Sequence, residues 1–158
     1  MGWRIAIGSD DAGFEYKEIL KKDLLEDPRV DEVIDVGVTA DGHTPYPHIG
    51  VEVGRRIAAG AADRGLLVCG TGMGVAIAAN KVPGIRASVA HDSYSVERLV
   101  KSNNAQVLAL GQRVIGIELA RKLAHEWLDH RFDESSPSAA KVAIFREYEK
   151  DAPATSAE

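Results

Sequence analysis

The stretch LLVCGTGMGVAIAANK, residues 66–81, decides how the chain folds. It opens with an apolar run that ends at Cys69, the chain's only cysteine, and it closes with a segment of helix-forming residues. Gly70, Gly72 and Gly74 separate the two parts. An apolar run, a glycine-rich turn and a helix in this order are typical of a βα unit in a parallel sheet.

The same alternation of short apolar runs and longer amphipathic segments continues along the chain. It predicts strands at residues 4–10, 30–37, 64–70, 85–92 and 105–111, and a loop at 39–48. It predicts helices at residues 13–27, 49–62, 75–82, 93–103, 116–130 and 138–151. Strands that alternate with helices favour an α/β fold, in which a five-stranded parallel sheet has helices on both faces. We expect a single domain over residues 1–150 and a disordered tail at 151–158.

The composition argues against several classes of protein. The chain has 158 residues, a formal net charge of -5 and a pI of about 5.5, which disfavours nucleic acid and anionic membranes as partners. One cysteine forms no internal disulfide, and no apolar stretch approaches the roughly 20 residues of a membrane span. The first residues lack the pattern of a secretory signal, so we expect a cytoplasmic protein. No His and Cys cluster has metal-ligand spacing, and we expect neither a metal nor another cofactor.

Polar residues gather where the predicted strands end. In open parallel sheets, ligands bind in the crevice beyond the carboxyl ends of the strands. This rule places along one edge Ser9, Asp10, Asp11, Cys69 to Gly74, His91, Asp92 and Gly111. The lone thiol therefore lies where a ligand is expected.

The glycine loop leaves two interpretations of Cys69. A free cysteine is often no more than a small buried hydrophobic residue. The glycines, however, permit conformations in which successive N–H groups form an anion-binding nest, which the start of the next helix reinforces. Such a nest favours a thiolate. A thiolate beside N–H donors suits proton abstraction next to a carbonyl, with the enediolate oxygen held by the N–H groups.

Three other kinds of loop fit these residues less well. A dinucleotide fingerprint G-x-G-x-x-G needs a glycine at Val75 or at Ile77, although Asp92 would suit a ribose contact. A P-loop needs Gly-Lys-Ser or Gly-Lys-Thr after the turn, and neither occurs. A cysteine-phosphatase loop needs an arginine where Val75 stands.

The run CGTGMGVAIAANKVPGIRA at 69–87 resembles the type B ribose-5-phosphate isomerases, as do GSDDAGF, YPH, NNAQVLALGQRVIG and the last helix. The similarity spans roughly Arg4 to Glu149, and the family includes allose-6-phosphate and galactose-6-phosphate isomerases. The resemblance implies a Rossmann-like three-layer sandwich and a homodimer with active sites at the subunit interface. It also implies metal-independent interconversion of aldose and ketose sugar phosphates.

The resemblance implies a role for each matching residue. Cys69 would be the catalytic base that takes the proton from C2 of the aldose and returns it to C1 through a cis-enediol. Thr71 would help move the hydroxyl proton, and the amides from Gly70 through Gly72 to Gly74 would stabilise the enediolate. The substrate-binding residues, some of them supplied by the neighbouring subunit, would be Asp10, Asp11, Tyr46, Asn103, Arg113 and Lys141.

Most of these binding residues also have a purely structural interpretation. Asp10, the expected ligand of a sugar hydroxyl, would equally cap the first helix, and Tyr46, the expected aromatic wall, would equally pack within its loop. Asn103, expected to reach the substrate, would equally end a helix. Arg113, the expected phosphate contact, would equally be a surface charge. We expect His91 to be structural or peripheral.

Four positions depart from the family's usual pattern. Asp11 and Ser102 stand where the family has histidines, and Pro137 and Lys141 stand where it has two arginines. An ionised Asp11 repels a phosphate dianion, and lysine lacks the bidentate fork of arginine. Serine cannot replace the ring-opening imidazole as an acid or base near pH 7. Asp11 and His91 are the candidates to take over that role.

We expect an aldose–ketose isomerase, with ribose 5-phosphate and ribulose 5-phosphate as the default substrate pair. The four departures support the hypothesis of another sugar, such as a tetrose phosphate, which cannot cyclise and needs no ring-opening histidine. The alternatives are the same chemistry on a hexose 6-phosphate or an unphosphorylated sugar, and a non-catalytic sugar- or nucleotide-binding module.

Overall fold

The computed structural model describes residues 1–151. The predicted tail at 151–158 lies outside the described residues, apart from Asp151, which caps the last helix. The strands are β1 (Trp3–Ser9), β2 (Val30–Asp35), β3 (Arg64–Cys69), β4 (Ala87–Val89) and β5 (Val107–Gly111). The helices are the short 3-10 turn η1 (Asp11–Gly13) and α1 (Phe14–Glu26), α2 (Tyr46–Ala58), α3 (Met73–Ala79), α4 (Ser93–Lys101), α5 (Ile117–Asp129) and α6 (Ser138–Lys150).

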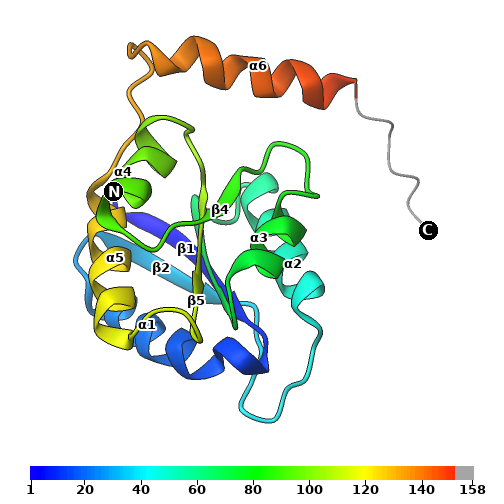
Figure 1. Cartoon of the computed structure of the whole chain (residues 1–158), viewed down its shortest axis with the longest axis vertical. Coiled ribbons are helices and arrows are strands. Elements are labelled where there is room, and N and C mark those ends of the chain that lie inside the picture. Colours follow the sequence, from blue (N-terminus) through cyan, green and yellow to red (C-terminus); the bar gives the residue numbers. More distant parts are fainter. Residues whose placement is uncertain (152–158) are drawn as a thin grey trace.

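The five strands form one parallel sheet in the order β2-β1-β3-β5-β4 (Figure 1). The central strand β3 and its neighbour β5 are buried at every position. A strand that is covered on both faces needs apolar or small residues throughout, which explains the continuous runs LLV and VLAL. The predicted α/β fold with a five-stranded parallel sheet is therefore confirmed.

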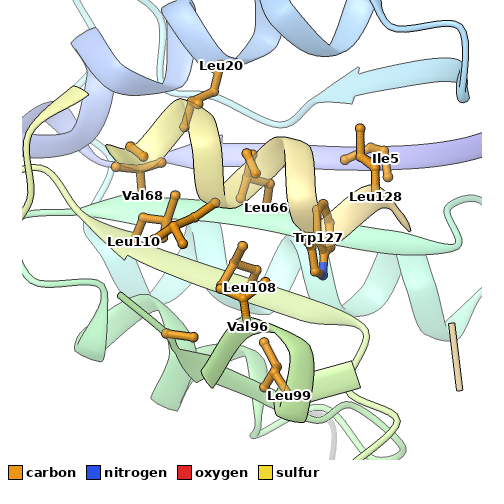
Figure 2. Close-up of a cluster of buried hydrophobic side chains, with 14 of the residues drawn as sticks. Ile5, Leu20, Leu66, Val68, Val96, Leu99, Leu108, Leu110, Trp127 and Leu128 are labelled. Carbon is orange, nitrogen blue, oxygen red and sulfur yellow. The ribbon is translucent and has the colours of Figure 1, made fainter. Parts of the chain in front are cut away.

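Helices cover both faces of the sheet. One face carries α1, α4 and α5, and its core includes Ile5, Leu20, Leu66, Val96, Leu108 and Trp127 (Figure 2). The opposite face carries α2 and α3, and its core includes Ala6, Ile49, Val53, Leu67, Val75 and Ala109. The result is the expected three-layer sandwich. None of the helices within residues 1–151 combines the length and the apolar character that a membrane crossing requires.

The start of α2 differs from the sequence prediction. The pattern predicts a loop at 39–48, but the helix already begins at Tyr46. Pro47 lies in its first turn, where the N–H that proline lacks would have no partner within the helix. Tyr46 therefore holds a fixed place at the start of a helix, and it is not part of the loop.

The last helix, α6, lies apart from the three layers (Figure 1). Its Val142 is buried, and Phe145 and Glu149 face residues that precede β4 and β5 across a shallow cavity. The Gly84 N–H donates to Oε1 of Glu149 at 3.2 Å. These contacts place α6 at the amino-terminal edge of β4 and β5, opposite the edge at which the strands end.

Candidate active site

Cys69 is the last residue of β3, at the carboxyl edge of the sheet. Side chains alternate along a strand, and Cys69 packs with Leu67 and Ala109 on the face that carries α2 and α3. The residue is 5% exposed, so it is almost fully buried in a single chain. The Gly72 N–H donates to its Sγ at 3.1 Å, which is the kind of contact that stabilises a negatively charged sulfur.

The turn after Cys69 depends on Gly72. Its φ of 79° is in the left-handed region, and an added Cβ would lie 3.0 to 3.1 Å from the backbone of Leu110. Any side chain at this position would force the turn away from β5. Glycine therefore allows the chain to turn back and direct an N–H at the preceding sulfur.

Residues that follow β5 hold the turn from the other side. The Gln112 N–H donates to the carbonyl of Cys69 at 2.9 Å, and the Arg113 N–H donates to the carbonyl of Gly70 at 3.0 Å. The Arg113 guanidinium lies beside Gly70, where an added Cβ would be 3.4 Å from its Nη1. The expected phosphate contact is thus brought next to the glycine loop.

Tyr46 forms another wall of this loop. An added Cβ at Gly74 would lie 2.4 Å from Cε2 of the Tyr46 ring, so the ring rests directly on the glycine. Thr71 is exposed, and its Oγ1 accepts a hydrogen bond from the Met73 N–H at 3.3 Å. The structure brings together Cys69, Thr71, the three glycines, Tyr46 and Arg113.

A buried lysine anchors the segment that leads to Tyr46. Lys17 is 1% exposed, and its Nζ donates to both carboxylate oxygens of Asp35 and, at 2.8 Å, to the carbonyl of Val38. Burial raises the pKa of Asp35, but hydrogen bonds from Lys21 and Lys17 outweigh burial and leave it below its ordinary value. This ion cluster fixes the chain where it leaves β2.

Asp10 occupies the capping position, one of the two roles that the sequence suggests for it. It caps η1 by accepting a hydrogen bond from the Gly13 N–H at 3.1 Å. Burial raises its pKa, the hydrogen bond from Gly13 and the charge of Arg113 oppose that rise, and the charge of Asp11 adds to it. An added Cβ at Gly13 would lie 3.0 Å from the Cα of Cys69, so the turn that Asp10 caps packs against the end of β3.

Asp11 lies beside a histidine, His43, that no sequence pattern singles out. Its Oδ2 lies 3.6 Å from Nδ1 of His43, and both side chains are largely exposed. His43 belongs to the loop before α2, 32 positions away along the chain. No periodicity or spacing links the two residues, because only the fold brings η1 beside this loop.

His91 lies at the same edge, next to β5. Its Nε2 accepts a hydrogen bond from the Gly111 N–H at 2.9 Å. Burial lowers its pKa below the ordinary value, and the charge of Asp92 opposes this shift. Asp92 itself caps α4 by accepting from the Ser95 N–H at 2.7 Å.

Two predicted binding residues are not brought to Cys69 within one chain. Asn103 precedes β5, and its Nδ2 donates weakly to the carbonyl of Arg98 at the end of α4, at 3.4 Å. β5 has five residues and spans roughly 16 Å between this edge and the edge of Cys69. Lys141 is exposed on α6, which packs at the same amino-terminal edge. Within the described chain, both residues therefore lie away from Cys69.

Among residues 1–151, His, Cys, Asp and Glu side chains do not gather in a group of three or more that would hold a metal ion. The acid and thiol groups at the carboxyl edge instead contact backbone N–H groups, as in Asp10 with Gly13 and Cys69 with Gly72.

Known proteins share both the sequence and the fold of this chain. The Ribose/Galactose Isomerase family profile matches residues 5–144. A Mycolicibacterium smegmatis protein named D-erythrulose-4-phosphate isomerase 2 is 59% identical, over 94% of this chain and 99% of its own length. A D-erythrulose-4-phosphate isomerase from Pectobacterium atrosepticum is 44% identical, over 92% and 97%. The structure of ribose-5-phosphate isomerase B from Clostridium thermocellum superposes with a TM-score of 0.88 at 40% identity, covering 94% of this chain and 98% of that one.

The expected family is therefore confirmed by sequence and by structure. The matched residues include the glycine loop, Tyr46 and Arg113, which the fold assembles at one edge of the sheet. The chain belongs to the ribose/galactose isomerase family, and it is a sugar-phosphate isomerase.

Proposed function

We propose that this protein interconverts D-erythrose 4-phosphate and D-erythrulose 4-phosphate by proton transfer at Cys69. The contact that carries the chemistry is the Gly72 N–H at 3.1 Å from the Cys69 sulfur, because it stabilises the thiolate that acts as the base. The choice of a four-carbon substrate rests on two relatives named D-erythrulose-4-phosphate isomerase and on the residues that this chain has at the substrate-binding positions.

The proposed reaction moves one proton between neighbouring carbons. The Cys69 thiolate takes the proton from C2 of the aldose. The electron pair of that C–H bond forms the C1=C2 double bond of a cis-enediol, while the π pair of the C1 carbonyl moves onto O1. Thr71 passes the hydroxyl proton between O1 and O2. The thiol then returns its proton to C1 and leaves the ketose. The backbone N–H groups of the glycine loop, other than that of Gly72, which contacts the sulfur, stabilise the charge on the enediolate oxygen, each by about 3 kcal/mol.

Ring opening separates the candidate substrates. In ribose 5-phosphate the 4-hydroxyl closes a ring on the aldehyde, so an isomerase must open this ring before it can abstract the proton. In erythrose 4-phosphate the 4-oxygen carries the phosphate, so no such ring forms. Ser102, which lacks an acid or base near pH 7, suits a substrate that needs no ring opening.

The carboxylate of Asp11 supports a substrate whose phosphate lies away from this residue. Asp11 stands where the resemblance leads us to expect a histidine, and it lies beside His43 instead of beside an arginine. A carboxylate repels a phosphate dianion, and a shorter substrate keeps its phosphate away from this position. Arg113, beside Gly70, then provides the phosphate contact from within the same chain.

A homodimer with shared active sites belongs to this proposal. Asn103 and Lys141 lie at the edge opposite Cys69 and would serve a neighbouring subunit. Exposed apolar side chains on α3 and α6 would be covered by a second chain; they are Met73, Ile77, Ile144, Phe145 and Tyr148.

The test compares kcat/KM for erythrose 4-phosphate with kcat/KM for ribose 5-phosphate, and follows deuterium entry at C2 for both. We expect a clear preference for the tetrose phosphate. Ser102→His should improve turnover of ribose 5-phosphate and leave that of erythrose 4-phosphate nearly unchanged, because only the pentose needs an acid for ring opening. A strong preference of the wild type for ribose 5-phosphate would overturn the substrate assignment in favour of the pentose.

A further inference from the structure

His91 makes a contact that regular strand pairing does not supply. The parallel ladder between β4 and β5 ends at the pair Val89 and Ala109. Gly111 lies beyond this point, and its N–H donates to Nε2 of His91 at 2.9 Å. A side chain thus continues the hydrogen bonding of β5 after the backbone of β4 has turned away.

Gly111 is in direct contact with the catalytic turn. It is the register partner of Cys69 between β5 and β3. An added Cβ at Gly111 would lie 2.8 Å from the carbonyl carbon and oxygen of Thr71, so the two backbones touch. The two residues that follow donate their N–H groups to the carbonyls of Cys69 and Gly70. A shift of Gly111 therefore moves the residues on both sides of the sulfur.

We infer that His91 is a positioning residue for the isomerisation, which acts through Gly111 on the turn around Cys69 and on Arg113. It does not contact the reacting atoms. It holds the start of the 111–113 segment from the β4 side, while the carbonyls of Cys69 and Gly70 accept hydrogen bonds from the other side of that segment. This inference rests on the proposed role of Cys69 as the base.

The protonation state of the ring fits this task. Burial lowers the pKa of His91 from its ordinary value of 6.5, and Asp92 only partly opposes the shift. The neutral ring has one nitrogen that accepts and one that donates, and Nε2 is the acceptor because it faces an N–H donor. Near pH 7 the contact with Gly111 is therefore maintained.

Three substitutions test whether the acceptor at the Nε2 position matters. In His91→Gln the amide oxygen reaches about as far as Nε2 and can accept from Gly111. In His91→Asn the oxygen reaches only about as far as Nδ1, and in His91→Leu there is no acceptor. We expect kcat to fall about tenfold in His91→Leu and His91→Asn with KM changed less than about threefold, and to be largely retained in His91→Gln.

Kinetics are measured on whichever sugar phosphate the wild type turns over fastest. If the wild type does not prefer the tetrose phosphate, the proposed substrate is wrong. The comparison among the His91 variants still holds in that case, because it uses the substrate that the wild type prefers. Exchange of the Gly111 amide proton, followed by NMR without substrate, gives a second readout. It should be faster in His91→Asn than in His91→Gln, and thermal unfolding confirms that each variant is folded.

Two results would overturn the inference. Equal kcat in His91→Asn and the wild type would show that the contact does not position the turn. Equal loss in His91→Gln and His91→Asn would show that the imidazole itself is required, as expected of a group that exchanges protons with the substrate. If His91→Leu does not fold, the Gln and Asn variants still decide between these outcomes.

Discussion

At the scale of single residues, the proposed chemistry depends on the geometry of one sulfur and one N–H group. The Gly72 N–H reaches Sγ of Cys69 at 3.1 Å only because the backbone at Gly72 has a φ of 79°. A residue with a Cβ would meet the backbone of Leu110 in this conformation. The same glycine that permits the turn therefore also supplies the N–H group that contacts the sulfur.

Cys69→Ala should abolish turnover and leave the fold in place. The loss of the base should lower kcat by at least about 10³-fold, because alanine cannot accept the carbon-bound proton. Alanine removes only a sulfur atom, so the free energy of unfolding should change by no more than about 1 kcal/mol. Deuterium exchange at C2 of the substrate and urea unfolding check the two parts. Exchange at the wild-type rate would remove the thiol from the mechanism.

Gly74→Ala should weaken substrate binding through Tyr46. The new Cβ would lie 2.4 Å from the ring, so the tyrosine must move away from the loop. We expect KM to rise about tenfold, because a displaced wall no longer orients the sugar. Gly116→Ala is the matched control, since no atom lies within 4 Å of its added Cβ. Unchanged KM in Gly74→Ala would show that Tyr46 does not line the site.

At the scale of elements, ion pairs join the helix ends on one face of the sheet. Asp27 caps the carboxyl end of α1, and its Oδ2 lies 2.6 Å from Nη2 of Arg29. The same arginine reaches Asp129 at the end of α5, where Nη1 and Oδ1 are also 2.6 Å apart. The Asp27 side chain is 10% exposed and that of Asp129 is 64% exposed, so water screens the second pair more strongly.

Asp27→Asn should reduce stability only above acidic pH. The hydrogen bond from Arg29 lowers the pKa of Asp27 from 3.8 to about 2. A carboxyl group whose pKa is lowered on folding stabilises the fold at pH values above its pKa in the unfolded chain. This contribution disappears as the pH falls toward about 2. We expect a loss of about 1 kcal/mol at pH 7, less than the full shift implies because of solvent screening, and no difference near pH 2.

The control for this prediction is Asp129→Asn, which removes the more exposed partner of the same arginine. Urea unfolding at several pH values should show a smaller loss for Asp129→Asn than for Asp27→Asn. A stability difference in Asp27→Asn that is independent of pH would contradict the assignment, because it would trace the effect to the cap and not to the charge.

At the scale of the whole molecule, the two edges of the sheet carry complementary parts of the proposed site. Cys69, Tyr46 and Arg113 lie at or beside the carboxyl edge, and Asn103 lies at the opposite edge. One chain cannot bring these parts together, because the strands separate them. Two chains that place opposite edges against each other can bring the parts together at two sites, one at each contact of the edges.

Mixed dimers should therefore recover activity from two inactive variants. Cys69→Ala and Asn103→Ala, unfolded and refolded together in equal amounts, should form dimers in which one of the sites has both residues. Random pairing predicts about a quarter of the wild-type activity. Refolding Cys69→Ala with the double variant is the control and should give none. A mixture that stays inactive, although light scattering shows dimers, would contradict the shared site.

The sequence predicted the fold closely, and it predicted part of the site. All five strands were located, and the apolar runs of β3 and β5 were the clearest because strands buried on both faces require such residues throughout. The rule that ligands bind beyond the carboxyl ends of parallel strands placed Asp10, Cys69 and His91 at one edge of the sheet. The observed strand topology places them at the same edge. The loop assigned to Tyr46 was wrong, because prolines marked the start of a helix as well as a turn.

Local pattern by itself determined the order of strands and helices, the parallel sheet and the glycine turn that follows Cys69, because each depends on neighbouring residues along the chain. The tertiary structure alone decided that Gly111 takes its acceptor from His91, that Asp11 meets His43, and that Asn103 lies away from Cys69. These contacts join residues far apart in sequence. Their geometry depends on how the strands pair and the helices pack, and that information is not present in any short segment.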